Sequence, residues 1–166
     1  WKDRAAGSAG FSLPLFETMF GRTSHEVVKM VKRSAQATIA VADPVWQHIR
    51  DEAHAAVRTE PLLGGFYHSG LLHHATLEKS LAFRFSMKLS SSEMSEQILR
   101  EIADEAYSAD PELGQAARAD IVAVFDRDPA CHRFLQPVLF FKGFQAIQAY
   151  RVGHWLWTQG RIDLAY

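Results

Sequence analysis

The stretch KGFQAIQAYRVGHWLW, residues 142–157, decides the fold expected for this chain. Its large apolar residues recur near helical spacing, and Gly160 follows them as a typical C-terminal stop signal. We therefore expect one long helix from about residue 137 to residue 159. Its apolar seam is expected to lie in the core or in a subunit interface, and it comprises Phe140, Phe144, Ile147, Tyr150 (or Arg151) and Leu156.

Length and composition indicate a single globular domain. The 166 residues are 48% hydrophobic, which is enough to bury a core. Eighteen basic and nineteen acidic residues give a formal net charge of −1, so no general attraction to nucleic acid or to an anionic membrane is expected. No apolar run approaches the roughly 20 residues that span a bilayer. A single cysteine excludes an internal disulfide framework and a thiolate zinc cluster.

The first 22 residues differ in character from the rest. Glycine, serine and proline interrupt any periodicity in residues 1–22, although this stretch is rich in phenylalanine and leucine. We expect an apolar arm that docks onto its own domain or onto a neighbour. Residues 23–166 are expected to form one domain. Because the first residue is Trp1 rather than Met, we also expect the chain to be a segment of a longer protein.

Capping signals divide residues 23–166 into seven or eight helices. Capping-box spacing marks starts at Thr23 and at Ser90-Ser91-Ser92-Glu93, and Thr76 opens another helix. Asp-Pro pairs mark further starts, because Asp caps free N–H groups and Pro suits the first helical position; these are Asp43-Pro44, Asp110-Pro111 and Asp128-Pro129. A short, glycine-weakened helix is expected over residues 62–72. Strand signals are nearly absent, so the predicted fold is an all-α helical bundle.

The sequence Asp126-Arg127-Asp128-Pro129 carries the strongest candidate chemistry. Two carboxylates and a guanidinium crowd an expected helix start, where N–H groups are unpaired and the helix dipole is positive. One interpretation is simple N-capping by Asp128. The other is a carboxylate held rigidly to receive an ammonium group from a ligand, since ordering the acceptor beforehand lowers the entropic cost of binding.

The histidines and the cysteine are weaker candidates. His73 and His74 are adjacent, and His48 and His54 are six residues apart, so neither pair shares a helix face for metal binding. We expect surface or capping histidines and no metal site. Cys131 is a conceivable nucleophile, because a helix start at Pro129 would lower its pKa; a small packing residue is the favoured interpretation.

Several segments resemble the N-terminal helical domain of the serine O-acetyltransferases. The resemblance covers about residues 43–166, and the segment from Lys142 onward is long enough to be specific by itself. One departure is Gln145, where the family usually has His. The matching segments are Trp46-x-x-Ile49-Arg50-x-Glu52-Ala53, Glu60-Pro61-x-Leu63, Phe66-Tyr67, Leu71-Leu72-x-His74, Leu77-Glu78, Lys88-Leu89, Arg127-Asp128-Pro129-Ala130, Lys142-Gly143-Phe144-x-Ala146-x-Gln148-Ala149-Tyr150-Arg151 and His154-x-Leu156-Trp157-x-x-Gly160-Arg161.

The resemblance implies an enzyme that acetylates the hydroxyl of L-serine with acetyl-CoA, in cysteine biosynthesis. In the family, the helical domain precedes a left-handed β-helix, which carries the catalytic His and the CoA contacts. We therefore expect no catalytic residue, no metal and no bound cofactor in this chain, with acetyl-CoA as co-substrate of the complete enzyme. Alone, these 166 residues are expected to be inactive.

The resemblance also implies a role for one acidic residue. In the family, the Asp that matches Asp128, followed by Pro129, binds the amino group of serine or of the inhibitor cysteine, and Arg127 is expected to support it. Expected partners are further copies of the chain, in a dimer of trimers, and O-acetylserine sulfhydrylase. The compartment would be cytoplasmic, or plastid or mitochondrial for a plant- or alga-like form. An alternative is a non-catalytic docking subunit of a larger complex.

Overall fold

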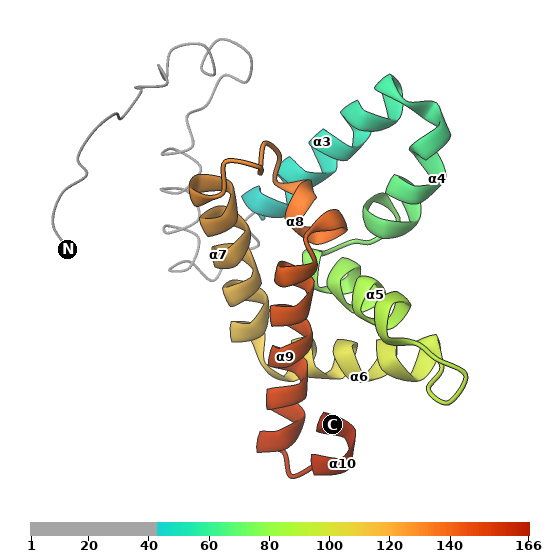
Figure 1. The fold of residues 1–166 in the computed structure, drawn as a ribbon, viewed down its shortest axis with the longest axis vertical. Helices are drawn as coiled ribbons and strands as arrows, with labels where there is room; N and C mark the ends of the chain where they lie inside the picture. The colour runs from blue at the N-terminus through green and yellow to red at the C-terminus, as the bar shows by residue number, and fades with distance from the viewer. Residues whose placement is uncertain (1–42) are drawn as a thin grey trace, which may run out of the picture.

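The structure is a computed structural model that describes residues 43–166 (Figure 1). The arm expected at residues 1–22 and the helix start expected at Thr23 lie outside these residues. Residues 43–166 form eight α-helices and contain no strand, which confirms the all-α prediction. The helices are α3 (Pro44–Thr59), α4 (Gly64–Tyr67), α5 (Leu77–Leu89), α6 (Glu96–Ala109), α7 (Pro111–Arg127), α8 (Leu135–Phe140), α9 (Lys142–Thr158) and α10 (Ile162–Ala165).

Three of the predicted helix starts have the expected caps. The Asp43 side chain accepts a hydrogen bond of 3.0 Å from the N–H of Trp46 at the start of α3. Asp110 caps α7, and Thr76 caps α5 in the same way. Each cap has an extended backbone, which turns the chain into the helix and satisfies one of its free N–H groups.

Helices α7 and α9 lie side by side, and α6 crosses near their lower ends in Figure 1, while α5 lies on the other side of α9. A 3₁₀ turn (Pro61–Leu63), α4 and a π-helical turn (His68–Leu72) connect α3 to α5. One core joins these helices, and burial of each large aliphatic side chain contributes about 1.5–3 kcal/mol. Its fully buried members include Ile49, Leu71, Leu77, Ile121, Leu135, Val138 and Val152.

The single helix expected over residues 137–159 is wrong, because the chain breaks at Phe141 into α8 and α9. Two side chains donate hydrogen bonds to the carbonyl groups that would otherwise accept the next backbone bonds of α8. Gln145 Nε2 donates to the carbonyl of Val138 at 3.0 Å, and Arg84 Nη2 donates to that of Leu139 at 2.9 Å. The helix is therefore stopped by tertiary contacts that have no local sequence signal.

The expected apolar seam of α9 is also only partly buried. Phe144 and Leu156 lie in the core, whereas Ile147 is 48% exposed and Tyr150 is 69% exposed. The buried face of α9 instead includes Gln148 and Val152. Gln148 is tolerated there because its amide donates to Asp120 Oδ2 at 2.9 Å.

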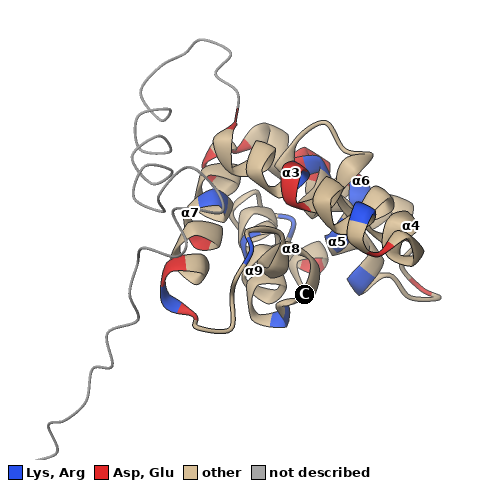
Figure 2. Ribbon diagram, turned by 90° about the horizontal axis from the view of Figure 1, so that it is seen from above, with Lys and Arg blue, Asp and Glu red and all other residues tan. Residues whose placement is uncertain are grey.

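Charged residues of both signs are spread over the described helices (Figure 2). This distribution agrees with the near-zero net charge and with the absence of a basic stripe. Among residues 43–166, no helix combines the length and the apolar character needed to cross a bilayer.

Candidate functional site

The candidate site is the turn that follows α7. Asp128 ends this helix: its N–H donates to the carbonyl of Val124 at 2.9 Å, and its own backbone is extended. The Asp128 side chain accepts from the N–H of Ala130 at 2.9 Å, and its carbonyl accepts from the N–H of Cys131 at 2.9 Å. The helix start predicted at Asp128-Pro129 is therefore wrong, because the Asp closes a turn on its own backbone instead of capping a helix.

Two side chains hold the far end of the turn. The carboxylate of Glu52, in α3, accepts from the N–H of Phe134 at 3.1 Å and from that of Leu135 at 2.9 Å. Gln136 Oε1 accepts from the N–H groups of His132, at 2.6 Å, and Arg133, at 2.9 Å. These bonds satisfy the free N–H groups at the start of α8 and fix the path of residues 128–134.

An aromatic contact anchors the same segment. Phe134 is only 3% exposed, and its ring stacks on that of Phe125 with centroids 4.5 Å apart. The ring of His48 meets Phe134 edge to face at 4.8 Å. His48 Nε2 also lies 3.4 Å from Glu52 Oε1, and this hydrogen bond raises the pKa of His48 although burial opposes the shift. The turn is thus attached to both α3 and α7.

The anchored turn presents Asp128 to solvent. Its Oδ1 is used by Ala130, whereas its Oδ2 has no partner among the described residues. Pro129 is exposed beside it. Arg127 is exposed too, and no ion pair joins it to Asp128. The structure therefore brings together Asp128 and Pro129, with one carboxylate oxygen available to an external hydrogen-bond donor.

Cys131 does not have the surroundings of a nucleophile. The side chain is buried, and burial raises the pKa of its thiol. No helix begins at Pro129, so the dipole that was expected to lower this pKa is absent. A thiol that stays protonated is a poor nucleophile, which favours the packing interpretation.

The histidines near the α4–α5 connection lie close together without a shared metal geometry. The rings of His68 and His73 are 5.7 Å apart, and those of His73 and His74 are 5.8 Å apart. His74 Nε2 lies 2.9 Å from the carbonyl of Ser69. Within residues 43–166, no three His, Cys, Asp or Glu side chains are grouped as metal ligands would be.

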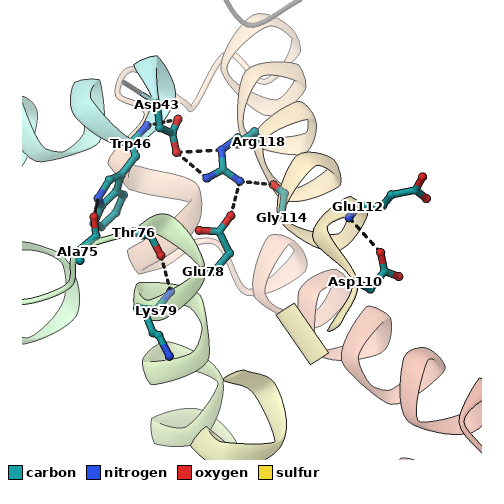
Figure 3. Close-up of polar contacts among 10 residues, drawn as sticks. All are labelled: Asp43, Trp46, Ala75, Thr76, Glu78, Lys79, Asp110, Glu112, Gly114 and Arg118. Atoms are coloured by element: carbon teal, nitrogen blue, oxygen red, sulfur yellow. Dashed lines mark hydrogen bonds and ion pairs between the residues drawn. The ribbon is translucent and has the colours of Figure 1, made fainter. Parts of the chain in front are cut away.

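A half-buried ion-pair network positions α7 and therefore the turn at its end (Figure 3). Arg118, in the middle of α7, donates from Nη2 to Asp43 Oδ2 at 2.6 Å and from Nη1 to Glu78 Oε1 at 2.6 Å. Nη1 also donates to the carbonyl of Gly114 at 2.8 Å. One guanidinium thus joins the start of α3, the first turn of α5 and the body of α7.

The network depends on close approach between α5 and α7. A Cβ atom on Gly114 would lie 2.4 Å from Glu78 Oε1, so only glycine leaves room for this carboxylate. Burial would raise the pKa of Glu78, but the hydrogen bond and charge of Arg118 outweigh burial and hold that pKa below its ordinary value. Asp43 was predicted as a helix cap, whereas the roles of Glu52, Glu78 and Arg118 were not predicted. The sequence feature that could have indicated these three residues is a charged side chain next to the apolar stripe of a helix.

These features define an all-α domain that presents one carboxylate on a rigid turn. The chain belongs to the family described as serine acetyltransferase, N-terminal, whose model matches residues 45–149. Over 121 residues it is 49% identical to the serine acetyltransferase of Escherichia coli K12, and the match covers 73% of this chain and 44% of that protein.

Solved structures show the same fold. The serine acetyltransferase of Brucella abortus S19 in complex with coenzyme A aligns with a TM-score of 0.74 at 45% identity, covering 78% of this chain and 52% of that one. The Neisseria gonorrhoeae enzyme in complex with serine aligns with a TM-score of 0.72 at 40% identity, covering 79% and 54%. The chain therefore spans about half the length of the relatives it matches.

Proposed function

We propose that this chain is the N-terminal domain of a serine O-acetyltransferase, which transfers the acetyl group of acetyl-CoA to the hydroxyl of L-serine. In this reaction the serine oxygen bonds to the acetyl carbon, the carbon–sulfur bond breaks, and the hydroxyl proton passes to a general base. The observation that carries the proposal is the exposed Asp128 carboxylate on an anchored turn, in a chain of this family. Relatives crystallised with coenzyme A and with serine support it.

In this proposal Asp128 binds the ammonium group of serine. Oδ1 is held by the N–H of Ala130, so the carboxylate is oriented before any ligand arrives. Oδ2 then accepts from the ammonium group. A charge-assisted hydrogen bond of this kind contributes about 1.5–3 kcal/mol, and prior ordering reduces the entropic cost. Cysteine carries the same ammonium group and would compete for the site. Pro129 restricts the backbone of the turn that carries Asp128. Arg127 supports Asp128 by placing a positive charge nearby.

The remaining parts of the enzyme are also proposals. The general base and the acetyl-CoA site lie in a β-helix that follows the helical domain of residues 23–166, so the 166 residues alone are inactive. The helical domains join copies of the enzyme, and O-acetylserine sulfhydrylase is a further partner. The compartment is cytoplasmic, plastid or mitochondrial. No observation favours the alternative of a non-catalytic docking subunit.

A chimera tests this function. Residues 43–166 would replace the matching part of the E. coli enzyme, and release of free thiol from acetyl-CoA would be measured with L-serine. We expect serine-dependent activity, while the 166-residue chain alone should show none. A chimera that folds and binds CoA but does not acetylate serine, beside an active parent enzyme, would contradict the proposal.

A further inference from the structure

A hollow between α5 and α9, with Val138 of α8 in its wall, is not used by the proposed function. Its volume is about 210 Å³. Its walls are mainly apolar and include Leu81, Phe85, Leu89, Val138, Phe144 and Ala149. We call this hollow the α5–α9 groove. An apolar cavity of about 150 Å³ is large enough for a benzene ring, so this groove accepts one ring or a chain of about six carbons.

The charged residues of the groove all have the same sign. Arg84, Lys88 and Lys142 line it, and no Asp or Glu does. Lys88 and Lys142 are exposed, and the polar side chains of Gln145 and Gln148 complete the wall. Three cations around an apolar wall complement a ligand that carries an anionic group on an apolar body.

Among these cations, Arg84 gives the clearest indication that the groove binds an anion. Its Nη2 donates to the carbonyl of Leu139, and its guanidinium lies 5.6 Å from the ring centre of Phe66. Its Nε is buried without a hydrogen-bond partner, and no described carboxylate pairs with the side chain. Burial accordingly lowers the pKa of Arg84. A half-buried cation without a counter-charge is costly, and an anion in the groove would supply one.

Two other half-buried arginines differ from Arg84. Arg118 pairs with Asp43 and Glu78, and Arg151 pairs with Asp120. These guanidinium groups are therefore satisfied within the fold. Arg50 also lacks a carboxylate partner, but its Nη1 donates to the carbonyls of Leu72 and His74 and it does not line the groove.

We propose that the α5–α9 groove binds a small carboxylate with an apolar body, such as a single ring on a short chain. The apolar part lies against Leu81, Val138 and Phe144. The carboxylate lies at the cationic side, near Arg84 and within reach of Lys142. Such a ligand satisfies both properties of the groove at once, the apolar walls and the unbalanced positive charge.

Titration of the protein with 3-phenylpropionate tests this, with 3-phenylpropan-1-ol as a neutral probe of the same skeleton. Methyl NMR signals of Leu81 and Val138 report occupancy. We expect saturable shifts with the carboxylate and at least about tenfold weaker binding of the alcohol, since charge-assisted bonds provide the difference. Equal affinity for the two probes, or no saturable shift with the carboxylate, would overturn the proposal.

Variants identify the cations. Arg84→Gln should weaken binding of 3-phenylpropionate about tenfold or more. Lys142→Gln, at an exposed position that does not threaten folding, should weaken it severalfold. Arg58→Gln removes one exposed positive charge that does not line the groove, so it should leave affinity unchanged. A loss with Arg58→Gln as large as that with Lys142→Gln would show general charge attraction and overturn the site.

Discussion

The carboxylate of Glu52 accepts a hydrogen bond of 2.9 Å from the backbone N–H of Leu135, 83 residues further along the chain. This bond, with the second one to Phe134, makes a side chain of α3 the N-terminal cap of α8. The segment between Asp128 and α8 is therefore fixed at both ends. The rigidity of the candidate site originates in a helix that is remote in sequence.

Removal of this cap should lower the stability of the protein. Glu52→Ala leaves two N–H groups at the start of α8 without an acceptor, and we expect the free energy of unfolding to fall by about 1–2 kcal/mol. Urea denaturation measures it. Asp51→Ala, at the exposed neighbouring position, should change stability by no more than about 0.5 kcal/mol. Equal effects of the two variants would show that the contact with α8 is not stabilising.

His48 should make part of this stability depend on pH. The hydrogen bond to Glu52, with the charges of Glu52 and Asp51, raises the pKa of His48 above 6.5 although burial lowers it. The protonated form is thus favoured by folding. Its contribution is fully present below pH 6.5 and is lost as the pH rises through the folded-state pKa.

The measurement is urea denaturation at pH 5.5 and pH 8.5, with an NMR titration of the His48 ring. His48→Gln should remove this part of the pH dependence, whereas His54→Gln, at an exposed position of the same helix, should not. A folded-state pKa of His48 at or below 6.5 would contradict the assignment.

Gly114→Ala should be destabilising although alanine is the better helix former. The gain in helix propensity is about 1 kcal/mol. Against it, the new Cβ would lie 2.4 Å from Glu78 Oε1 and 3.0 Å from Arg118 Nη1, so the two side chains must shift out of their present ion-pair geometry. We expect overpacking and the disturbed ion pair to exceed the gain, with a net loss of about 1–2 kcal/mol.

The matched variant is Gly143→Ala in α9, where no heavy atom lies within 4 Å of the added Cβ, and it should be neutral or stabilising. In Gly114→Ala the pKa of Glu78 should also rise toward its ordinary value, because Arg118 no longer lowers it. An unchanged Glu78 pKa together with raised stability would show that α5 and α7 separate without cost.

Local capping chemistry predicted much of the fold. Asp43-Pro44, Asp110-Pro111 and Thr76 start helices as expected, because each needs only its own side chain and the next turn. The Ser90–Glu93 box was misplaced: Ser91 accepts from the N–H groups of Glu93 and Met94 in a turn, and α6 begins at Glu96 after Ser95. Several serines in residues 90–95 can each cap a helix, so the sequence alone does not determine which of them precedes α6.

The sequence predicts which residue forms the candidate site, but it does not predict the conformation of the turn that carries this residue. Asp128 was selected from its local sequence and from a family resemblance, yet an Asp-Pro pair suits both a helix start and a turn. The choice between them depends on Glu52 and Gln136, which occupy the N–H groups that follow. The break at Phe141 likewise depends on Arg84 and Gln145. Such contacts between distant residues have no periodic or local signal.

The central claim is that Asp128 binds the ammonium group of serine. Its most direct test is the serine KM of the chimera that carries Asp128→Asn, compared with Asp126→Asn, which removes the same charge from an exposed position two residues away. We expect Asp128→Asn to raise the serine KM about tenfold or more and to weaken inhibition by cysteine, with the KM for acetyl-CoA unchanged. An unchanged serine KM, or an equal rise in Asp126→Asn, would contradict the account.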